Sequence, residues 1–285
     1  MERAMQHIKN SLTALVKIYR SATDRRLKQR IVETWLRVFF LHRFDGRNQL
    51  ANILGYKVKF LDYDLLAFLF KELFIENNYY FNAQKSDPLI IDCGSNIGMS
   101  ILYFNTLYPK SRIVGFEPAD IAFLCLKENI KNNLLDSVTV YNVALSDKEG
   151  FTELYYDPEH PGSLYMSIIP ERFPKHKRRV EASLLSKYIE EEIDFLKIDI
   201  EGAELSVLQE ICSAGKIYFV QQMVIEYHHH IKAEWDYFSR ILGVLENVGF
   251  GYQIESKLGR PLKPRQFQDI LIFAYRKKPA PGPYH

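Results

Sequence analysis

The sequence predicts an α/β protein built on a doubly wound, mostly parallel sheet, with a C-terminal antiparallel hairpin and an N-terminal helical extension. From residue 88 onward, short apolar runs alternate with amphipathic helical segments, which is the order of a parallel sheet covered by helices. The runs are apolar at successive positions, as strands buried on both faces are. Two final strand-like runs have no helix between them, and these predict the hairpin.

Five runs predict the parallel strands, and they cover residues 89–92, 113–117, 138–142, 195–200 and 220–226. Helical periodicity predicts helices over residues 99–108, 121–132, 204–214 and 231–247. Gly215 directly follows the predicted helix 204–214, at the position after a helix where glycine is common. The hairpin strands are expected over residues 252–255 and 269–275. Residues 86–278 therefore form one predicted domain, which a tail over 279–285 follows.

Residues 1–85 are expected to form a helical extension or lid. Helix is predicted over residues 1 to about 50, where apolar residues recur at helical spacing between Leu27 and Phe40, and again over 63–74. The first apolar stripe predicts a packed face, a lid or a dimer contact, and peripheral membrane contact is the alternative. The proline-rich segment 151–185 is expected to be an irregular loop that forms part of the substrate wall.

The composition argues against several classes of protein. The formal net charge is only +2, and the basic run 175–179 predicts a solvated loop or a contact to an anionic substrate, so no nucleic-acid partner is expected. The three cysteines are far apart, which fits a reducing cytoplasm and makes a disulfide framework or a zinc site unexpected. No signal core is visible, and no stretch reaches the roughly 20 apolar residues of a bilayer span.

A glycine-bearing turn joins the first predicted strand to its helix. Gly94 allows a tight turn with positive φ, and Gly98 allows the helix to pack close to the strand and a ligand. Asp92 stands at the strand tip, where it can bind the amino-acid portion of a ligand directly or through water. Glu117 ends the next strand 19 residues after Gly98. A carboxylate at that position accepts both ribose hydroxyls of a nucleoside.

The glycine spacing favours one nucleoside ligand over another. A nicotinamide dinucleotide favours G-x-G-x-x-G, whose middle glycine lets the backbone approach a pyrophosphate. Asn96 holds that middle position here. S-adenosylmethionine has no phosphate, and its carboxylate and amine need an anion-binding turn and an acid. We therefore expect S-adenosylmethionine, with an NAD(P)-dependent oxidoreductase as the alternative.

Four segments together resemble the FkbM-type methyltransferases: 92–98 (DCGSNIG), 115–118 (GFEP), 142–147 (NVALSD) and 194–204 (DFLKIDIEGAE). Residues 226–228 match the family's late acid-x-His element, and the resemblance spans about residues 55–275. It implies a class I methyltransferase (Rossmann-like) fold, S-adenosylmethionine as donor, and O-methylation of sugars or polyketide-type hydroxyls. It also implies cofactor contacts for Asp92, Gly94, Ser95, Asn96, Gly98 and Glu117, with Asn142 and Ala144 near the adenine.

Acids, a lysine and a histidine converge at the ends of the predicted fourth and fifth strands. Lys197, Asp199 and Glu201 alternate along the fourth strand, and Glu226 and His228 along the fifth. These ends open on the ligand crevice. His228 is the preferred general base because its ordinary pKa lies near working pH, and Asp199 or Glu226 could orient its ring or take the proton. Lys197 either joins this catalytic set or only neutralises the acids.

A divalent metal ion is the competing explanation of this cluster. Asp199, Glu226 and His228 could hold Mg²⁺ or another divalent ion that lowers the pKa of a hydroxyl, although no spacing fixes a ligand geometry. Glu204 is expected to be a first-turn carboxylate that faces the helix dipole. Nucleobase N-methylation is not expected, because Asp-Ile-Glu-Gly at 199–202 replaces the Asp/Asn-Pro-Pro-aromatic element of those enzymes.

The sequence thus predicts a cytoplasmic, S-adenosylmethionine-dependent methyltransferase that acts on a hydroxyl of a small molecule, sugar or glycan. A non-catalytic binding protein that keeps the cofactor fold is an alternative from another class. The acids at 92, 117, 199 and 226 argue against that alternative. The acceptor and the oligomeric state have no readable signature in the sequence.

Overall fold

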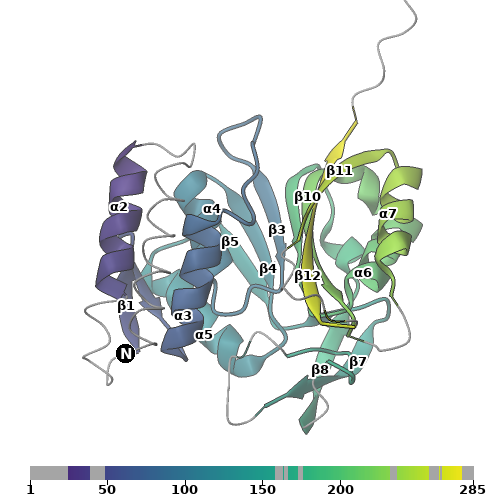
Figure 1. Ribbon diagram of the computed structural model, residues 1–285, viewed down its shortest axis with the longest axis horizontal. Coiled ribbons are helices and arrows are strands. Elements are labelled where there is room, and N and C mark those ends of the chain that lie inside the picture. Colours follow the sequence, from purple (N-terminus) through teal and green to yellow (C-terminus); the bar gives the residue numbers. More distant parts are fainter. Residues whose placement is uncertain are drawn as a thin grey trace, which may run out of the picture.

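The computed structural model describes residues 25–38, 49–157, 163, 166–172, 176–231, 236–256, 263 and 265–277. The first 24 residues of the expected N-terminal helix and the predicted tail 279–285 lie outside these ranges. At the centre is a seven-stranded sheet in the order β11-β12-β10-β9-β3-β4-β5 (Figure 1). This order is the doubly wound arrangement that the sequence predicts.

Five strands of the sheet run parallel, and the last two form the closing hairpin. The parallel strands are β3 Leu89–Cys93, β4 Arg112–Phe116, β5 Val138–Tyr141, β9 Ile193–Ile198 and β10 Val220–His229. β12 (Gln268–Arg276) runs antiparallel to both of its neighbours, β10 and β11 (Phe250–Ser256). The expected mixed sheet with an antiparallel C-terminal hairpin is confirmed.

Helices cover both faces of the sheet (Figure 1). α4 (Met99–Leu107) and α5 (Asp120–Asn132) lie on one face, and α6 (Glu204–Ser213) and α7 (Phe238–Asn247) on the other. Ile90 of β3 packs with the first pair, whereas Ile91 packs with the second, which explains the continuous apolar run. At the edge strand β5 the prediction of two buried faces is wrong, because its residues alternate between half-buried and exposed.

Two helix ends test the predicted boundaries. Gly215 follows α6 with φ +69, as expected for the residue after a helix, and the short 3₁₀-helix η5 (Lys216–Phe219) leads into β10. α7 begins at Phe238 instead of residue 231, and residues 232–235 lie outside the described part of the chain.

The described part of the N-terminal extension contains α2 (Arg25–Leu36), the hairpin β1 (Leu50–Ile53) and β2 (Tyr56–Lys59), α3 (Tyr63–Phe70) and the π-helix η3 (Lys71–Ile75). The helix expected over 63–74 is confirmed. The hairpin was not predicted because its strands have only four residues each and its turn has one glycine. Both turn residues, Leu54 and Gly55, have positive φ (52° and 95°), as in a type I′ turn.

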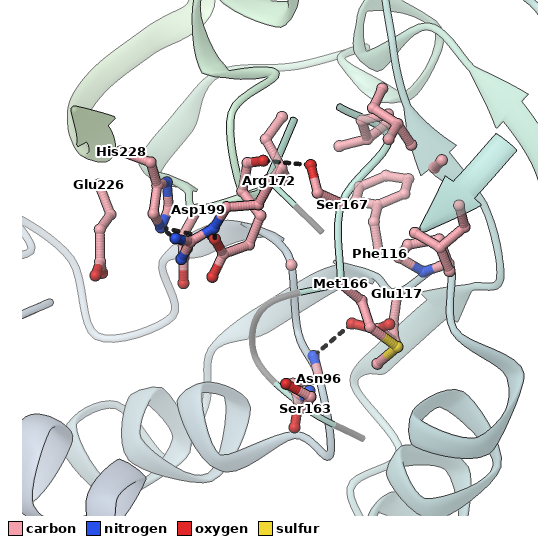
Figure 2. Close-up of a pocket in the computed structure, with 18 of the residues that line it drawn as sticks. Asn96, Phe116, Glu117, Ser163, Met166, Ser167, Arg172, Asp199, Glu226 and His228 are labelled. Carbon is pink, nitrogen blue, oxygen red and sulfur yellow. Dashed lines mark hydrogen bonds and ion pairs between the residues drawn. The ribbon is translucent and has the colours of Figure 1, made fainter. Parts of the chain in front are cut away.

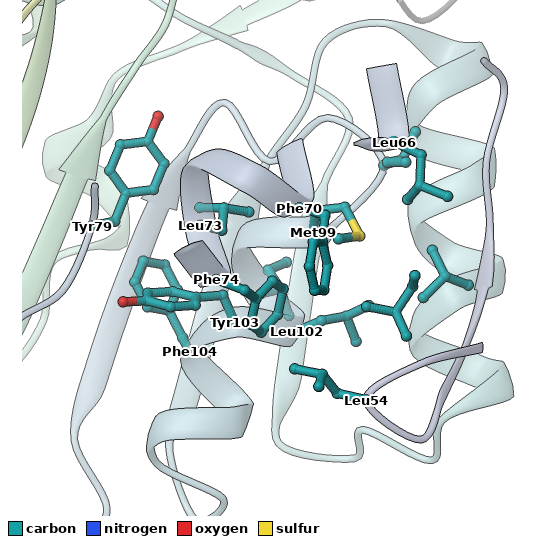
Figure 3. Packing of buried hydrophobic residues seen from close by; sticks show 14 of the residues in the cluster. Leu54, Leu66, Phe70, Leu73, Phe74, Tyr79, Met99, Leu102, Tyr103 and Phe104 are labelled. Atoms are coloured by element: carbon teal, nitrogen blue, oxygen red, sulfur yellow. The ribbon is translucent and has the colours of Figure 1, made fainter. Parts of the chain in front are cut away.

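Aromatic side chains join this extension to α4 in one hydrophobic cluster (Figure 3). Trp35 of α2 stacks on Phe70 of α3 at 6.1 Å between centroids, and Phe74 meets Tyr103 of α4 edge-on at 5.3 Å. These contacts fix the position of the segment after η3, which carries Tyr79 toward the carboxyl ends of the strands.

The segment after β5 folds into a second small sheet. β6 (Ala144–Leu145), β7 (Gly150–Tyr156) and β8 (His176–Ser183) pair in the order β6-β8-β7, and the 3₁₀-helix η4 (Leu185–Tyr188) follows. The prediction of an irregular loop over 151–185 is therefore wrong for its two ends. Its prolines lie between the strands, and β8 buries Val180 and Ala182 at a spacing of two, which was the missed strand signal.

From His176 onward, the basic run expected on a solvated loop lies on β8, and two of its side chains form ion pairs. Lys177 Nζ lies 2.7 Å from Glu153 Oε1, and Arg178 Nη2 lies 2.7 Å from Asp120 Oδ2. All three cysteines are free thiols, as expected. Among the described residues, none of the helices is long and apolar enough to span a bilayer.

Candidate functional site

The turn after β3 lies tightly against the end of β9 and the middle of α5. Gly94 has φ +89°, and a Cβ there would stand 1.9 Å from the Asp199 carbonyl oxygen. Gly98 has φ +91°, and a Cβ there would stand 2.6 Å from Leu126 Cδ1. Close approach and backbone conformation together therefore require glycine at both positions, as the sequence predicts.

Gly94→Ala is expected to destabilise the protein. A left-handed non-glycine residue costs about 1–2 kcal/mol, and the overlap with a backbone carbonyl cannot be relieved by rotating a side chain. Gly243→Ala in α7 is the matched control, because no described atom lies within 4 Å of a Cβ there. Alanine at 243 should stabilise by up to about 1 kcal/mol. Urea unfolding measures both effects, and wild-type stability of Gly94→Ala would contradict the expectation.

Glu117 follows β4 and lines the pocket drawn in Figure 2. Its Oε1 accepts from the Ala119 amide and its Oε2 from the Asn96 amide, each at 2.8 Å. The side chain is buried, and this burial raises the pKa of Glu117 to about 7, although the hydrogen bonds from the two amides lower it. Each oxygen keeps a further lone pair for a hydroxyl donor. Glu117 therefore presents two oriented oxygens to the pocket.

The other expected cofactor residues divide into lining and supporting positions. Three of them line the pocket: Gly94, Asn96 and Ala144. Asp92 is fully buried, and its carboxylate accepts from Ser100 Oγ at 2.6 Å and lies 3.2 Å from Lys197 Nζ. It faces the interior beneath the turn, so its position does not support the expected direct contact with a ligand.

Three further expected cofactor residues lie outside the pocket lining: Ser95, Gly98 and Asn142. Ser95 Oγ donates to the Asp92 carbonyl at 3.1 Å. Asn142 Nδ2 donates to the carbonyl oxygens of Glu117 at 2.9 Å and Pro118 at 3.2 Å. These bonds hold the turn and the tip of β4 in place.

Lys197 lies at the end of β9 and is almost completely buried. Its Nζ lies 3.2 Å from both Asp92 Oδ1 and Asp199 Oδ2, and it donates to the Gly94 carbonyl at 2.8 Å. Burial alone would lower the pKa of Lys197, but the two aspartates outweigh it and raise this pKa. Burial would raise the pKa of Asp199, but Lys197 and His228 lower it. Lys197 is therefore placed as a counter-ion that keeps Asp199 ionised.

His228 has a carboxylate on each ring nitrogen. Nδ1 lies 2.9 Å from Glu204 Oε1, and Nε2 lies 3.3 Å from Glu201 Oε2 and 3.8 Å from Asp199 Oδ1. Because a neutral ring has only one N–H, this arrangement favours the imidazolium. Burial alone would lower the pKa of His228, but the two glutamates raise it well above its usual range. Glu204 orients the ring, rather than Asp199 or Glu226.

Tyr79 joins this charged cluster from the N-terminal side, and no sequence signal marked it. Its hydroxyl lies 2.5 Å from Glu226 Oε2 and 3.1 Å from Asp199 Oδ2. One hydroxyl proton cannot serve two carboxylates, so when Tyr79 donates to Asp199, Glu226 must be protonated and donate to Tyr79. Burial and the neighbouring Asp199 raise the pKa of Glu226 well above its usual range. The two carboxyl groups therefore shift in opposite directions, and Asp199 is the one whose ionised form the cluster favours.

Described residues between β7 and β8 line one wall of the pocket, and their expected contact with a substrate stays a prediction. Met166, Ser167 and Arg172 line the pocket (Figure 2), and Ser167 Oγ donates to the Glu201 carbonyl. Arg172 Nε donates to Glu201 Oε2 at 2.7 Å. Glu201 does not continue the alternation of β9, which ends at Ile198; it lies in the following turn with φ 57°.

Asp199, Glu226 and His228 also meet the geometric condition for holding a metal ion. They form one of two such groups among the described residues, with donor atoms that all lie within 4.8 Å of one another. Metal binding would require His228 Nε2 to lose its proton and its contact with Glu201. The observed contacts favour the hydrogen-bonded cluster over the metal alternative.

The chain is similar to known methyltransferases. A family model described as the methyltransferase FkbM domain matches residues 92–252, which include every expected cofactor and catalytic residue. Methyltransferase sdnD from Sordaria araneosa is 32% identical over 176 residues, which cover 50% of this chain and 67% of that protein. The 31-O-demethyl-FK506 methyltransferase FkbM from Streptomyces tacrolimicus is 26% identical over 148 residues, which cover 50% of this chain and 56% of that protein.

Among solved structures, methyltransferase FkbM from Methylobacillus flagellatus KT superimposes with a TM-score of 0.47 at 15% identity. That superposition covers 94% of this chain and 60% of the other.

Proposed function

Because the chain belongs to the FkbM methyltransferase family, we propose that it transfers a methyl group from S-adenosylmethionine to a hydroxyl of a small molecule, sugar or glycan. One observation carries this proposal: a single pocket joins the two oriented oxygens of Glu117 to the ionised carboxylate of Asp199. The name of the Streptomyces relative includes an O-demethyl substrate, which supports oxygen as the methylated atom.

The residues at the Glu117 end fit the donor. Glu117 would accept the two ribose hydroxyls, and Phe116, Val143 and Ala144 offer an apolar wall for the adenine. The turn that contains Gly94 would lie along the amino-acid portion. When bound, S-adenosylmethionine supplies an electrophilic methyl group on its sulfonium sulfur.

The residues at the other end prepare the acceptor. Holding the two reactants in line is the main contribution expected of such a site. We assign Asp199 as the group that accepts the proton of the acceptor hydroxyl, because it lines the pocket and its pKa is lowered. Glu201 also lines the pocket, but its carboxylate is paired with Arg172 and His228. His228 and Lys197 keep Asp199 ionised, and Tyr79 fixes its Oδ2. This assignment replaces His228 as the base, since both of its nitrogens already face carboxylates.

Two measurements test the proposal. Calorimetry should detect binding of S-adenosylmethionine, and the absence of binding at millimolar ligand would refute it. A panel of hydroxylated acceptors should then give S-adenosylhomocysteine with at least one compound. Binding without transfer to any acceptor would favour the non-catalytic alternative. Stabilisation by NAD or NADP but not by S-adenosylmethionine would favour an oxidoreductase.

A further inference from the structure

Two consecutive histidines at the end of β10 face the same carboxylate. Neighbouring residues of a strand point to opposite faces, but His230 has φ +63°, which is uncommon for a residue other than glycine. This conformation brings the rings of His229 and His230 to 3.8 Å between centroids. Both rings approach Asp236, which precedes α7. Backbone strain of this kind clusters at functional sites.

The hydrogen bond of His230 fixes which of its nitrogens carries the proton. Nδ1 lies 2.9 Å from the carbonyl oxygen of Gln266, which can only accept, so Nδ1 is the N–H. The other ring nitrogen, Nε2, lies 3.4 Å from Asp236 Oδ2. A carbonyl that holds one nitrogen and orients the other is the usual partner of a metal-binding histidine.

His229 presents a second nitrogen toward the same carboxylate. Its Nδ1 is buried, lies 3.1 Å from Asp236 Oδ1, and has no hydrogen-bond partner among the described residues. Imidazole nitrogen and carboxylate oxygen are both common ligands of divalent transition-metal ions. One divalent cation could therefore be held between the three side chains.

The distances suit such an ion. Zn²⁺ binds imidazole nitrogen and carboxylate oxygen at about 2.0–2.2 Å with tetrahedral geometry, so neighbouring ligand atoms stand about 3.3 Å apart. The two nitrogen–oxygen contacts here are 3.1 Å to Oδ1 and 3.4 Å to Oδ2 of Asp236. One donor atom from each of the three residues lies within 4.8 Å of the other two. We propose that His229, His230 and Asp236 bind a divalent transition-metal ion such as Zn²⁺ outside the donor pocket. The ion ties the end of β10 to the start of α7.

The test uses the full chain, freed of any purification tag and of bound metal by chelation. Titration with Co²⁺, followed by its visible absorption and by displacement with Zn²⁺, should show one ion per chain. Asp236→Asn and His230→Ala should each weaken binding at least about tenfold, since each removes a ligand. His176→Ala is the matched control, because this exposed histidine of β8 lies outside the cluster and should leave the affinity unchanged.

Glu226→Gln distinguishes the two possible metal groups. It removes a donor from the group with Asp199 and His228 but none from the group proposed here. Unchanged affinity in this variant supports the proposal. Absence of binding by the wild type, full affinity in Asp236→Asn, or loss confined to Glu226→Gln would each overturn it. Asp236 is 42% exposed, so Asp236→Asn should fold even where His230→Ala does not.

Discussion

Glu117→Ala should weaken binding of S-adenosylmethionine by about tenfold or more, since hydrogen bonds to a charged group contribute about 1.5–3 kcal/mol each. The substitution removes both carboxylate oxygens that accept the ribose hydroxyls in the proposed function. It also leaves the amides of Asn96 and Ala119 without their acceptor, so some loss of stability is expected. Calorimetry on the folded variant measures the affinity, and an unchanged dissociation constant would refute the role of Glu117.

The same carboxylate should make donor binding depend on pH. The ionised form accepts from two hydroxyls, whereas the protonated form keeps fewer free lone pairs. Because burial raises the pKa of Glu117 to about 7, affinity should rise as the pH increases through neutrality. Glu117→Gln is the control, since it keeps the shape and cannot titrate. If the affinity of Glu117→Gln still depends on pH in the same way, another group is responsible.

The stability of the free protein should follow the opposite trend. The pKa of Glu117 is about 7 in the folded chain and near the ordinary value of 4.5 in the unfolded chain. Between pH 4.5 and about 7, Glu117 binds more protons in the folded chain than in the unfolded chain. The contribution of Glu117 to the stability of the protein therefore falls as the pH rises. Donor binding and unfolding experiments therefore report the same group with opposite signs.

The sequence predicted those parts of the fold that have a local pattern. Buried parallel strands have apolar residues at successive positions, as Leu89–Ile91 of β3 shows, and the glycines at 94 and 98 mark a turn that only glycine can form. β7 and β8 were missed because prolines lie between them and few of their residues are buried. The β1–β2 hairpin was missed because strands of four residues carry almost no periodic signal.

The sequence could identify a candidate site residue when that residue stands at the end of one predicted strand. Glu117, which lines the pocket, could be singled out because its spacing from Gly98 can be read directly from the sequence. The contacts of His228 with Glu204, and of Tyr79 with Glu226, join elements that are distant in sequence, so no spacing could show them. The direction of a side chain was equally invisible, and Asp92 turns beneath the loop instead of into the pocket.

Asp199→Asn should reduce turnover by about a hundredfold or more, because a positioned proton acceptor contributes roughly 10²–10⁴. Asparagine keeps the shape but cannot take the proton of the acceptor hydroxyl. Lys197 retains Asp92 as its partner, so the variant should fold and should bind S-adenosylmethionine with nearly wild-type affinity. Turnover is measured with an acceptor that the panel identifies.

His228→Ala provides the comparison that separates two assignments of the base. If His228 only holds Asp199 ionised, donor binding should persist and turnover should be much slower. The pKa of Asp199 should then rise, so part of the activity should return at higher pH. If His228 is itself the base, this variant should be inactive at every pH, while Asp199→Asn should lose much less. The contacts of both ring nitrogens with carboxylates favour the first outcome, because an imidazolium has no lone pair with which to accept a proton.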